Sequence, residues 1–135
     1  MISLLTSTLT VYFQKLDYTF VGIDKKEIDD LNLSMQPIAM EPEPELRKND
    51  EIFVFQHPKG QPKKYSQDKI VGVKPPFVLY KADTKSGSSG SPVVTTVGLK
   101  LVGIHHTGCK ELSYNKGTLC SEILQDLKSG MCMSL

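Results

Sequence analysis

The sequence predicts an all-β fold, with an antiparallel barrel or sandwich and one short C-terminal helix. Six short runs rich in β-branched and aromatic residues follow one another over residues 51–121, and turn residues such as HPKGQP, KPP and TKSGSSG separate them. The runs are EIFVFQ (51–56), KIVGV (69–73), FVLYKA (77–82), SPVVTTV (91–97), KLVGIHH (100–106) and GTLCS (117–121). Short strands at this spacing are typical of antiparallel sheets.

The N-terminal third reads as a separate part of the chain. Residues 2–13 and 16–23 are rich in Val, Tyr, Phe, Thr and Ile, which predicts two extended segments before a polar connection with room for one short helical turn. Residues 41–50, EPEPELRKND, hold two prolines and four acids and predict a surface linker. We therefore expect an N-terminal segment over 1–40, this linker, and a barrel over 51–135.

A helix is expected after the last β-rich run, in SEILQDLKSG. Ser121 is an acceptable N-cap, and Gly130 is a suitable stop. Three apolar residues share one face of this helix: Ile123, Leu124 and Leu127.

Composition excludes several classes of function. The chain has 135 residues and a formal net charge of +1, so no large field of one sign favours nucleic acid, and Lys59, Lys63 and Lys64 form only a local basic turn. No apolar run approaches the length of a membrane span, and the N-terminus is a poor signal peptide. We expect no nucleic-acid or membrane partner.

The three cysteines are Cys109, Cys120 and Cys132. Their odd number and wide spacing disfavour a disulfide framework and favour a cytoplasmic or nuclear location. A zinc site from Cys109, Cys120 and either His105 or His106 is the alternative, but the spacing matches no standard pair of zinc ligands. We therefore expect no metal and no cofactor.

The stretch SGSSGSP, residues 86–92, is either a flexible connector or a stiff turn that presents a nucleophile. It joins two strands of one expected sheet, and Pro92 restricts the backbone at its exit, which favours the stiff turn. A serine that attacks a carbonyl group needs a tight turn and nearby N–H donors for the oxyanion. Gly87 and Gly90 flank Ser89 and permit such a turn.

Several segments carry a resemblance to a known family. GSSGSPV resembles the G-x-S-G-[GS]-P-V motif around the nucleophile of chymotrypsin-like serine proteases, in particular the disulfide-free branch near the glutamyl endopeptidases. The surrounding segments are similar to that family in the same order: LDYTFVGID, FQHPKGQPKKYS, FVLYKADTKSGSSGSPVV, LKLVGIHHTG and NKGTLCSEIL. Together they cover roughly residues 9–130. The resemblance implies a chymotrypsin-like fold, with the second barrel complete and the first truncated.

The same resemblance implies roles for individual residues. Ser89 would be the nucleophile, the N–H groups of Gly87 and Ser89 would form the oxyanion hole, and Asp17 would orient the catalytic histidine. The segment LKLVGIHHTG would form one wall of the pocket for the P1 side chain and would pair with the substrate backbone. The substrate-binding residues implied in this way are Asp83, Thr84, His105, Thr107 and Gly108.

The general base of this family has no counterpart here. The family order is His, Asp, Ser, and no histidine precedes Asp17. The order of Asp17, His57 and Ser89 copies that of subtilisin, whose parallel α/β sheet this sequence does not support. His57 lies in a turn, where a structural role is ordinary. We therefore expect either a fragment whose histidine lies upstream or an inactive homologue, with an exposed inter-barrel face through which copies could associate.

Two residues compete for the selection of the P1 side chain. His105 matches the histidine with which glutamyl endopeptidases receive an acidic side chain, whereas Asp83 lies six residues before Ser89, as does the acid with which trypsins select Lys or Arg. The sequence does not decide between them.

Two functions follow from these observations. The first is a trypsin-like serine endopeptidase, or a fragment of one, that acts on a polypeptide by acyl transfer through Ser89. The second is an inactive protease-like module that binds an extended peptide as an added strand. A plain β-barrel without a site is a third reading. We expect a serine-type peptidase homologue whose catalytic set is incomplete in this chain.

Overall fold

The computed structural model describes residues 10–13, 15–30, 38–40, 45–109 and 113–132. It divides into two compact units, Met1–Pro37 and Ile38–Leu135. Two predicted segments lie partly outside the described residues. These are residues 2–9 of the first extended segment and residues 41–44 of the linker.

The first unit contains a hairpin and a short helix. Strands β1 (Thr10–Phe13) and β2 (Tyr18–Val21) pair antiparallel, and helix α1 (Lys25–Asp30) follows them. Asp17 is the last residue before β2 and has a φ of +52°, which places it in the turn of the hairpin. Both strands fall within the segments that the sequence predicted as extended.

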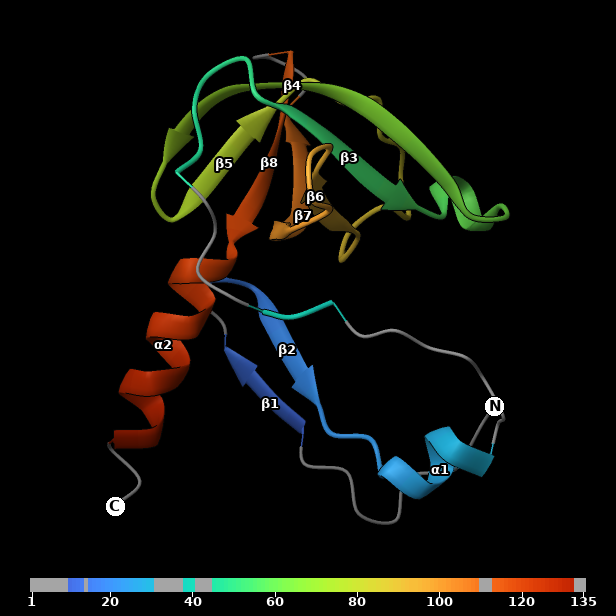
Figure 1. Cartoon of the computed structure of the whole chain (residues 1–135), viewed down its shortest axis with the longest axis vertical. Helices are drawn as coiled ribbons and strands as arrows, with labels where there is room; N and C mark the ends of the chain where they lie inside the picture. Colours follow the sequence, from blue (N-terminus) through green and yellow to red (C-terminus); the bar gives the residue numbers. More distant parts are fainter. Residues whose placement is uncertain (1–9, 14, 31–37, 41–44, 110–112, 133–135) are drawn as a thin grey trace. The chain divides into compact units, whose positions relative to one another are not determined.

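The second unit is a closed antiparallel barrel, which confirms the predicted all-β class (Figure 1). Its strands neighbour one another in the order β3-β4-β5-β8-β7-β6. The strands are β3 (Glu51–Gln56), β4 (Lys64–Lys74), β5 (Phe77–Tyr80), β6 (Pro92–Thr95), β7 (Leu101–Cys109) and β8 (Tyr114–Leu119). Because β3 also pairs with β6, the sheet closes and these strands leave no free edge.

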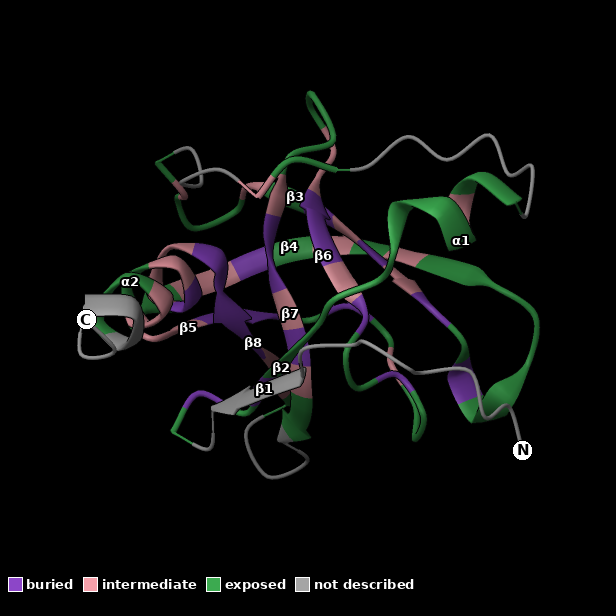
Figure 2. Cartoon of the chain, turned by 90° about the horizontal axis from the view of Figure 1, so that it is seen from below, coloured by how far each residue is buried: buried purple, intermediate pink, exposed green. Residues whose placement is uncertain are grey.

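The barrel interior is filled by side chains at alternate strand positions. In β3 the inward positions are Ile52, Val54 and Gln56, and the first two are fully buried. Each Val or Ile buried in this way contributes about 1.5–3 kcal/mol. The buried core cluster consists of Ile52, Val54, Ile70, Val78, Tyr80, Ala82, Val93, Val102 and Leu119. Figure 2 shows buried residues along the strands of the barrel.

Helix α2 (Cys120–Cys132) follows β8 directly and contacts β7 and β8. It begins one residue before the expected N-cap Ser121, because the buried Cys120 at its start leaves no loop between strand and helix. It also continues past Gly130, which in a helix interior costs only about 1 kcal/mol. None of the helices among the described residues has the length and apolarity to cross a bilayer.

Candidate active site

The stretch between β5 and β6 is a tight turn. Gly87 has a φ of +90° and Gly90 a φ of +83°, a region that side-chain-bearing residues rarely adopt. A Cβ atom on Gly87 would lie 3.3 Å from the backbone nitrogen of Lys59 and 3.4 Å from the carbonyl oxygen of His57. The turn therefore needs glycine at position 87 both for its backbone angle and for its close approach to the segment after β3.

Backbone hydrogen bonds hold the turn against β7. The Ser88 N–H donates to the Lys85 carbonyl at 3.1 Å, and the Ser91 N–H donates to the Ser88 carbonyl at 3.1 Å. The Gly90 N–H donates to the carbonyl of His105 at 2.8 Å, and the His105 N–H donates back to the Ser91 carbonyl at 2.8 Å. These bonds favour the stiff turn over the flexible connector.

Ser89 is exposed at the tip of this turn. Its hydroxyl donates to the carbonyl of His106 at 3.3 Å. Within the described part of the chain, the N–H groups of Gly87 and Ser89 donate to no backbone carbonyl. Two unengaged amides beside an exposed hydroxyl are the donors that an oxyanion hole requires.

A cleft of about 720 Å³ opens beside Ser89. Asp83, Thr84, His105, Thr107 and Gly108, the residues predicted to bind substrate, all line it. The structure therefore brings these residues and the predicted nucleophile together in one cavity. Their roles in binding stay predictions.

The family of this domain follows from a comparison with known proteins. The family described as "Trypsin-like peptidase domain" matches residues 5–104, which is more than half of the sequence. The chain belongs to this family. This membership confirms the resemblance to trypsin-like serine proteases seen in the sequence.

Solved structures share its fold. The active form of the Rv3671c protease from M. tuberculosis has a TM-score of 0.72 and is 15% identical, over 90% of this chain and 56% of that chain. An inactive form gives a TM-score of 0.70 at 14% identity, over 90% of this chain and 66% of that one. A curated relative, "Secreted RxLR effector protein 73" of Plasmopara viticola, is 31% identical over 87 residues. The match covers 56% of this chain and 22% of that relative.

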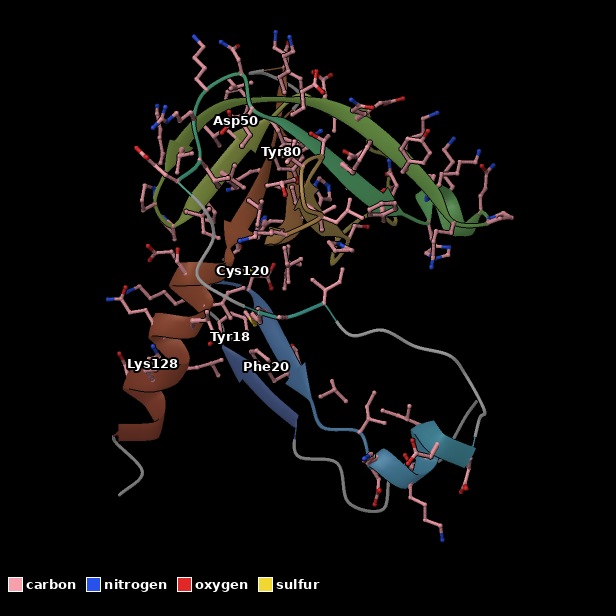
Figure 3. The ribbon with its side chains drawn as sticks, in the orientation of Figure 1. Tyr18, Phe20, Asp50, Tyr80, Cys120 and Lys128 are labelled. Atoms are coloured by element: carbon pink, nitrogen blue, oxygen red, sulfur yellow. The ribbon has the colours of Figure 1, made fainter. Side chains whose placement is uncertain are left out.

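In the trypsin-like peptidase domain a buried pair of side chains borders the cleft. The Tyr80 hydroxyl lies 2.6 Å from Nδ1 of His105, and both residues are buried (Figure 3 labels Tyr80). Burial lowers the pKa of His105, and the neighbouring His106 acts in the same direction. Burial also raises the pKa of Tyr80, so its hydroxyl keeps its proton. The lowered pKa of His105 favours the neutral form of its ring.

This burial predicts that acid destabilises the domain. The ordinary pKa of histidine is 6.5, and His105 in the folded chain has a lower value. Below pH 6.5 the unfolded chain therefore binds more protons than the folded chain. As the pH is lowered, the free energy of unfolding falls until the pH is below the pKa of His105 in the folded chain. We expect the melting temperature to fall between pH 7.5 and pH 5, as calorimetry can measure. His105→Gln should flatten the pH dependence of the melting temperature, and His57→Gln should not. If wild type and both variants show the same pH dependence, His105 is not the group responsible.

The remaining sequence predictions have mixed outcomes. His57 is exposed, and its Nδ1 lies 3.0 Å from the Gln61 carbonyl, as expected of a structural histidine in a turn. Asp17 belongs to the first unit, and its role as the orienting acid stays a prediction. The side chain of Cys109, named in the zinc alternative, lies outside the description. Among the described residues no three His, Cys, Asp or Glu side chains gather into a metal site.

Sequence reasoning missed other residues in the cleft and directly behind it. Lys59, Lys81 and Lys85 line it, but they are scattered in the sequence and only Lys59 fell in the basic turn. Tyr80 was counted only as part of a strand. Gln56 could have been identified from the sequence, because a polar residue at an inward position of an otherwise apolar strand indicates a buried, hydrogen-bonded side chain.

Proposed function

We propose that this domain is part of a serine endopeptidase, with Ser89 as its nucleophile. Its Oγ attacks the substrate carbonyl, and its proton passes to a histidine outside these 135 residues, which Asp17 orients. The N–H groups of Gly87 and Ser89 stabilise the oxyanion. The histidine returns the proton to the leaving amine, and water then hydrolyses the acyl ester. The turn that presents Ser89 beside two unengaged amides carries this proposal.

The runner-up is an inactive peptide-binding module. It is favoured by the hydrogen bond of the Ser89 hydroxyl to the His106 carbonyl. A fluorophosphonate probe separates the two functions, because it reacts with an activated serine hydroxyl. Labelling mapped to Ser89 supports the peptidase. No labelling, together with binding of extended peptides, supports the module.

For the substrate we propose a peptide with an acidic P1 side chain. Three lysines and one acid line the cleft together with His105, whose lowered pKa favours a neutral ring. The net positive charge of these lining side chains favours a carboxylate over the Lys or Arg side chain that Asp83 alone would select. The three lysines are Lys59, Lys81 and Lys85.

A second hollow extends this basic surface. It has a volume of about 270 Å³ and shares Lys59, Asp83 and Lys85 with the main cleft. It adds Lys64, whose Nζ donates to Oε1 of Gln61 at 2.9 Å. A peptide with acidic residues on both sides of P1 would meet lysines in both cavities.

Charge reversal tests this substrate class. We expect Lys64→Glu to weaken binding of a fluorescent acidic hexapeptide about three- to fivefold at low salt, as for other exposed charges. Fluorescence anisotropy gives the dissociation constants. The matched control is Lys63→Glu, because Lys63 has the same charge and lines neither cavity. Equal losses in the two variants would show that only net charge matters and would contradict a defined site.

A further inference from the structure

Gln56 is a buried polar side chain at the end of β3, with only 4% of its surface exposed. Its amide makes three hydrogen bonds. Oε1 accepts from the Ser88 hydroxyl at 2.6 Å, and Nε2 donates to Oγ of Ser66 at 3.0 Å and to the carbonyl of Asp83 at 2.8 Å. One side chain therefore links β3, β4, the wall of the cleft and the turn that carries Ser89.

The direction of these bonds is fixed by chemistry. A backbone carbonyl only accepts hydrogen bonds, so the Gln56 atom that faces the Asp83 carbonyl must be Nε2. Oε1 then faces Ser88, whose hydroxyl must donate to it. The Ser88 oxygen in turn accepts from the Lys85 N–H at 3.4 Å. If the amide group were turned by half a rotation, Oε1 would face the Asp83 carbonyl, and two acceptors cannot form a hydrogen bond.

The partners of Gln56 are the segments that shape the candidate site. Ser88 lies between Gly87 and Ser89, whose N–H groups are the proposed oxyanion donors. Asp83 lies in the wall of the cleft. We infer that Gln56 is the positioning residue of this site: through Ser88 it sets the direction of the two amides, and through Asp83 it sets the cleft wall. This inference rests on the proposed function.

A purely structural role is the competing explanation, because a buried glutamine with every hydrogen bond made also stabilises a barrel. The two roles differ in where a substitution acts. Loss of a positioning residue loosens the turn around Ser89, whereas loss of a structural residue weakens the whole barrel. Local and global effects are separable by amide hydrogen exchange.

The test compares Gln56→Met, which keeps the length of the side chain without its hydrogen bonds, with Val78→Ala. Val78 is fully buried in β5 and serves as the control for lost stability. Under conditions where both variants are folded, amide exchange is measured by NMR for three protected N–H groups of the turn, those of Ser88, Gly90 and Ser91. The rate of fluorophosphonate labelling is measured on the same samples.

We expect Gln56→Met to speed exchange of the three turn amides at least tenfold more than that of β7–β8 amides, and to slow labelling about tenfold or more. Val78→Ala should speed exchange throughout the barrel and leave labelling unchanged. Uniform exchange in Gln56→Met would overturn the inference. If wild type is not labelled even at the slow rate expected of a serine without its base, the proposed function fails, yet the exchange pattern still decides the role of Gln56. If Gln56→Met does not fold, Ser88→Ala removes the 2.6 Å bond from the other side, and the same readouts apply.

Discussion

We expect replacement of Ser89 by alanine to remove all fluorophosphonate labelling of the chain. The probe forms its bond with the serine oxygen, so no residual reaction at this position is expected. Ser86→Ala is the matched control, because Ser86 is an exposed serine that lines the same cleft. We expect Ser86→Ala to be labelled at the rate of wild type, as measured by intact-protein mass spectrometry over time.

Two results would contradict the assignment of Ser89. One is labelling that survives in Ser89→Ala, and the other is labelling that disappears in Ser86→Ala. The wild-type rate is itself informative, because a serine without its base retains only the part of the acceleration that the oxyanion donors and binding supply, about 10³–10⁴-fold over water in known proteases. A histidine supplied by a longer chain should raise the rate well above that level.

Gly87→Ala is expected to have the second-largest effect. An alanine at a φ of +90° is strained, and its Cβ would approach the Lys59 nitrogen to 3.3 Å. Relief of this strain rotates the peptide whose N–H is a proposed oxyanion donor. We expect labelling to slow about 10²–10³-fold, as for the loss of one such donor, and the free energy of unfolding to fall by about 1–3 kcal/mol.

Gly98→Ala controls for the strain alone. Gly98 has a φ of +76° in the turn between β6 and β7, and the nearest atom to an added Cβ is in the Lys100 side chain, 3.9 Å away. It should lower stability and leave labelling of Ser89 unchanged. Were both glycine variants to lose labelling in proportion to their stability, the oxyanion role of position 87 would be wrong.

The sequence predicted the barrel because its strands carry local signals. The alternation in β3 and the β-branched run in β6 show which side chains face the core. The polar half of β4, residues 64–68, was not part of any predicted strand. It is held by pairing with β3 and by ring contacts of Tyr65 with Phe53 and Phe55 at 5.5 and 6.3 Å. Such pairing joins residues far apart in the sequence and leaves no local pattern.

The candidate site was predicted in part for the same reason. The motif around Ser89 is contiguous, so its turn could be read from its glycines. The contact between Tyr80 and His105 spans 25 residues, and that between Gln56 and Ser88 spans 32. Both depend on strand register, which the sequence did not supply. The competition between Asp83 and His105 stayed open in the sequence because loop lengths differ between the branches of the family, so the offset of either residue from Ser89 does not decide its role.

A crystal structure of the chain with a peptidyl boronic acid bearing an acidic P1 side chain tests the central claim most directly. We expect a tetrahedral boron bound to Oγ of Ser89, with one boronate oxygen within hydrogen-bond distance of the N–H groups of both Gly87 and Ser89. Boron bound at another residue, or a boronate oxygen turned away from those amides toward solvent, would contradict the account.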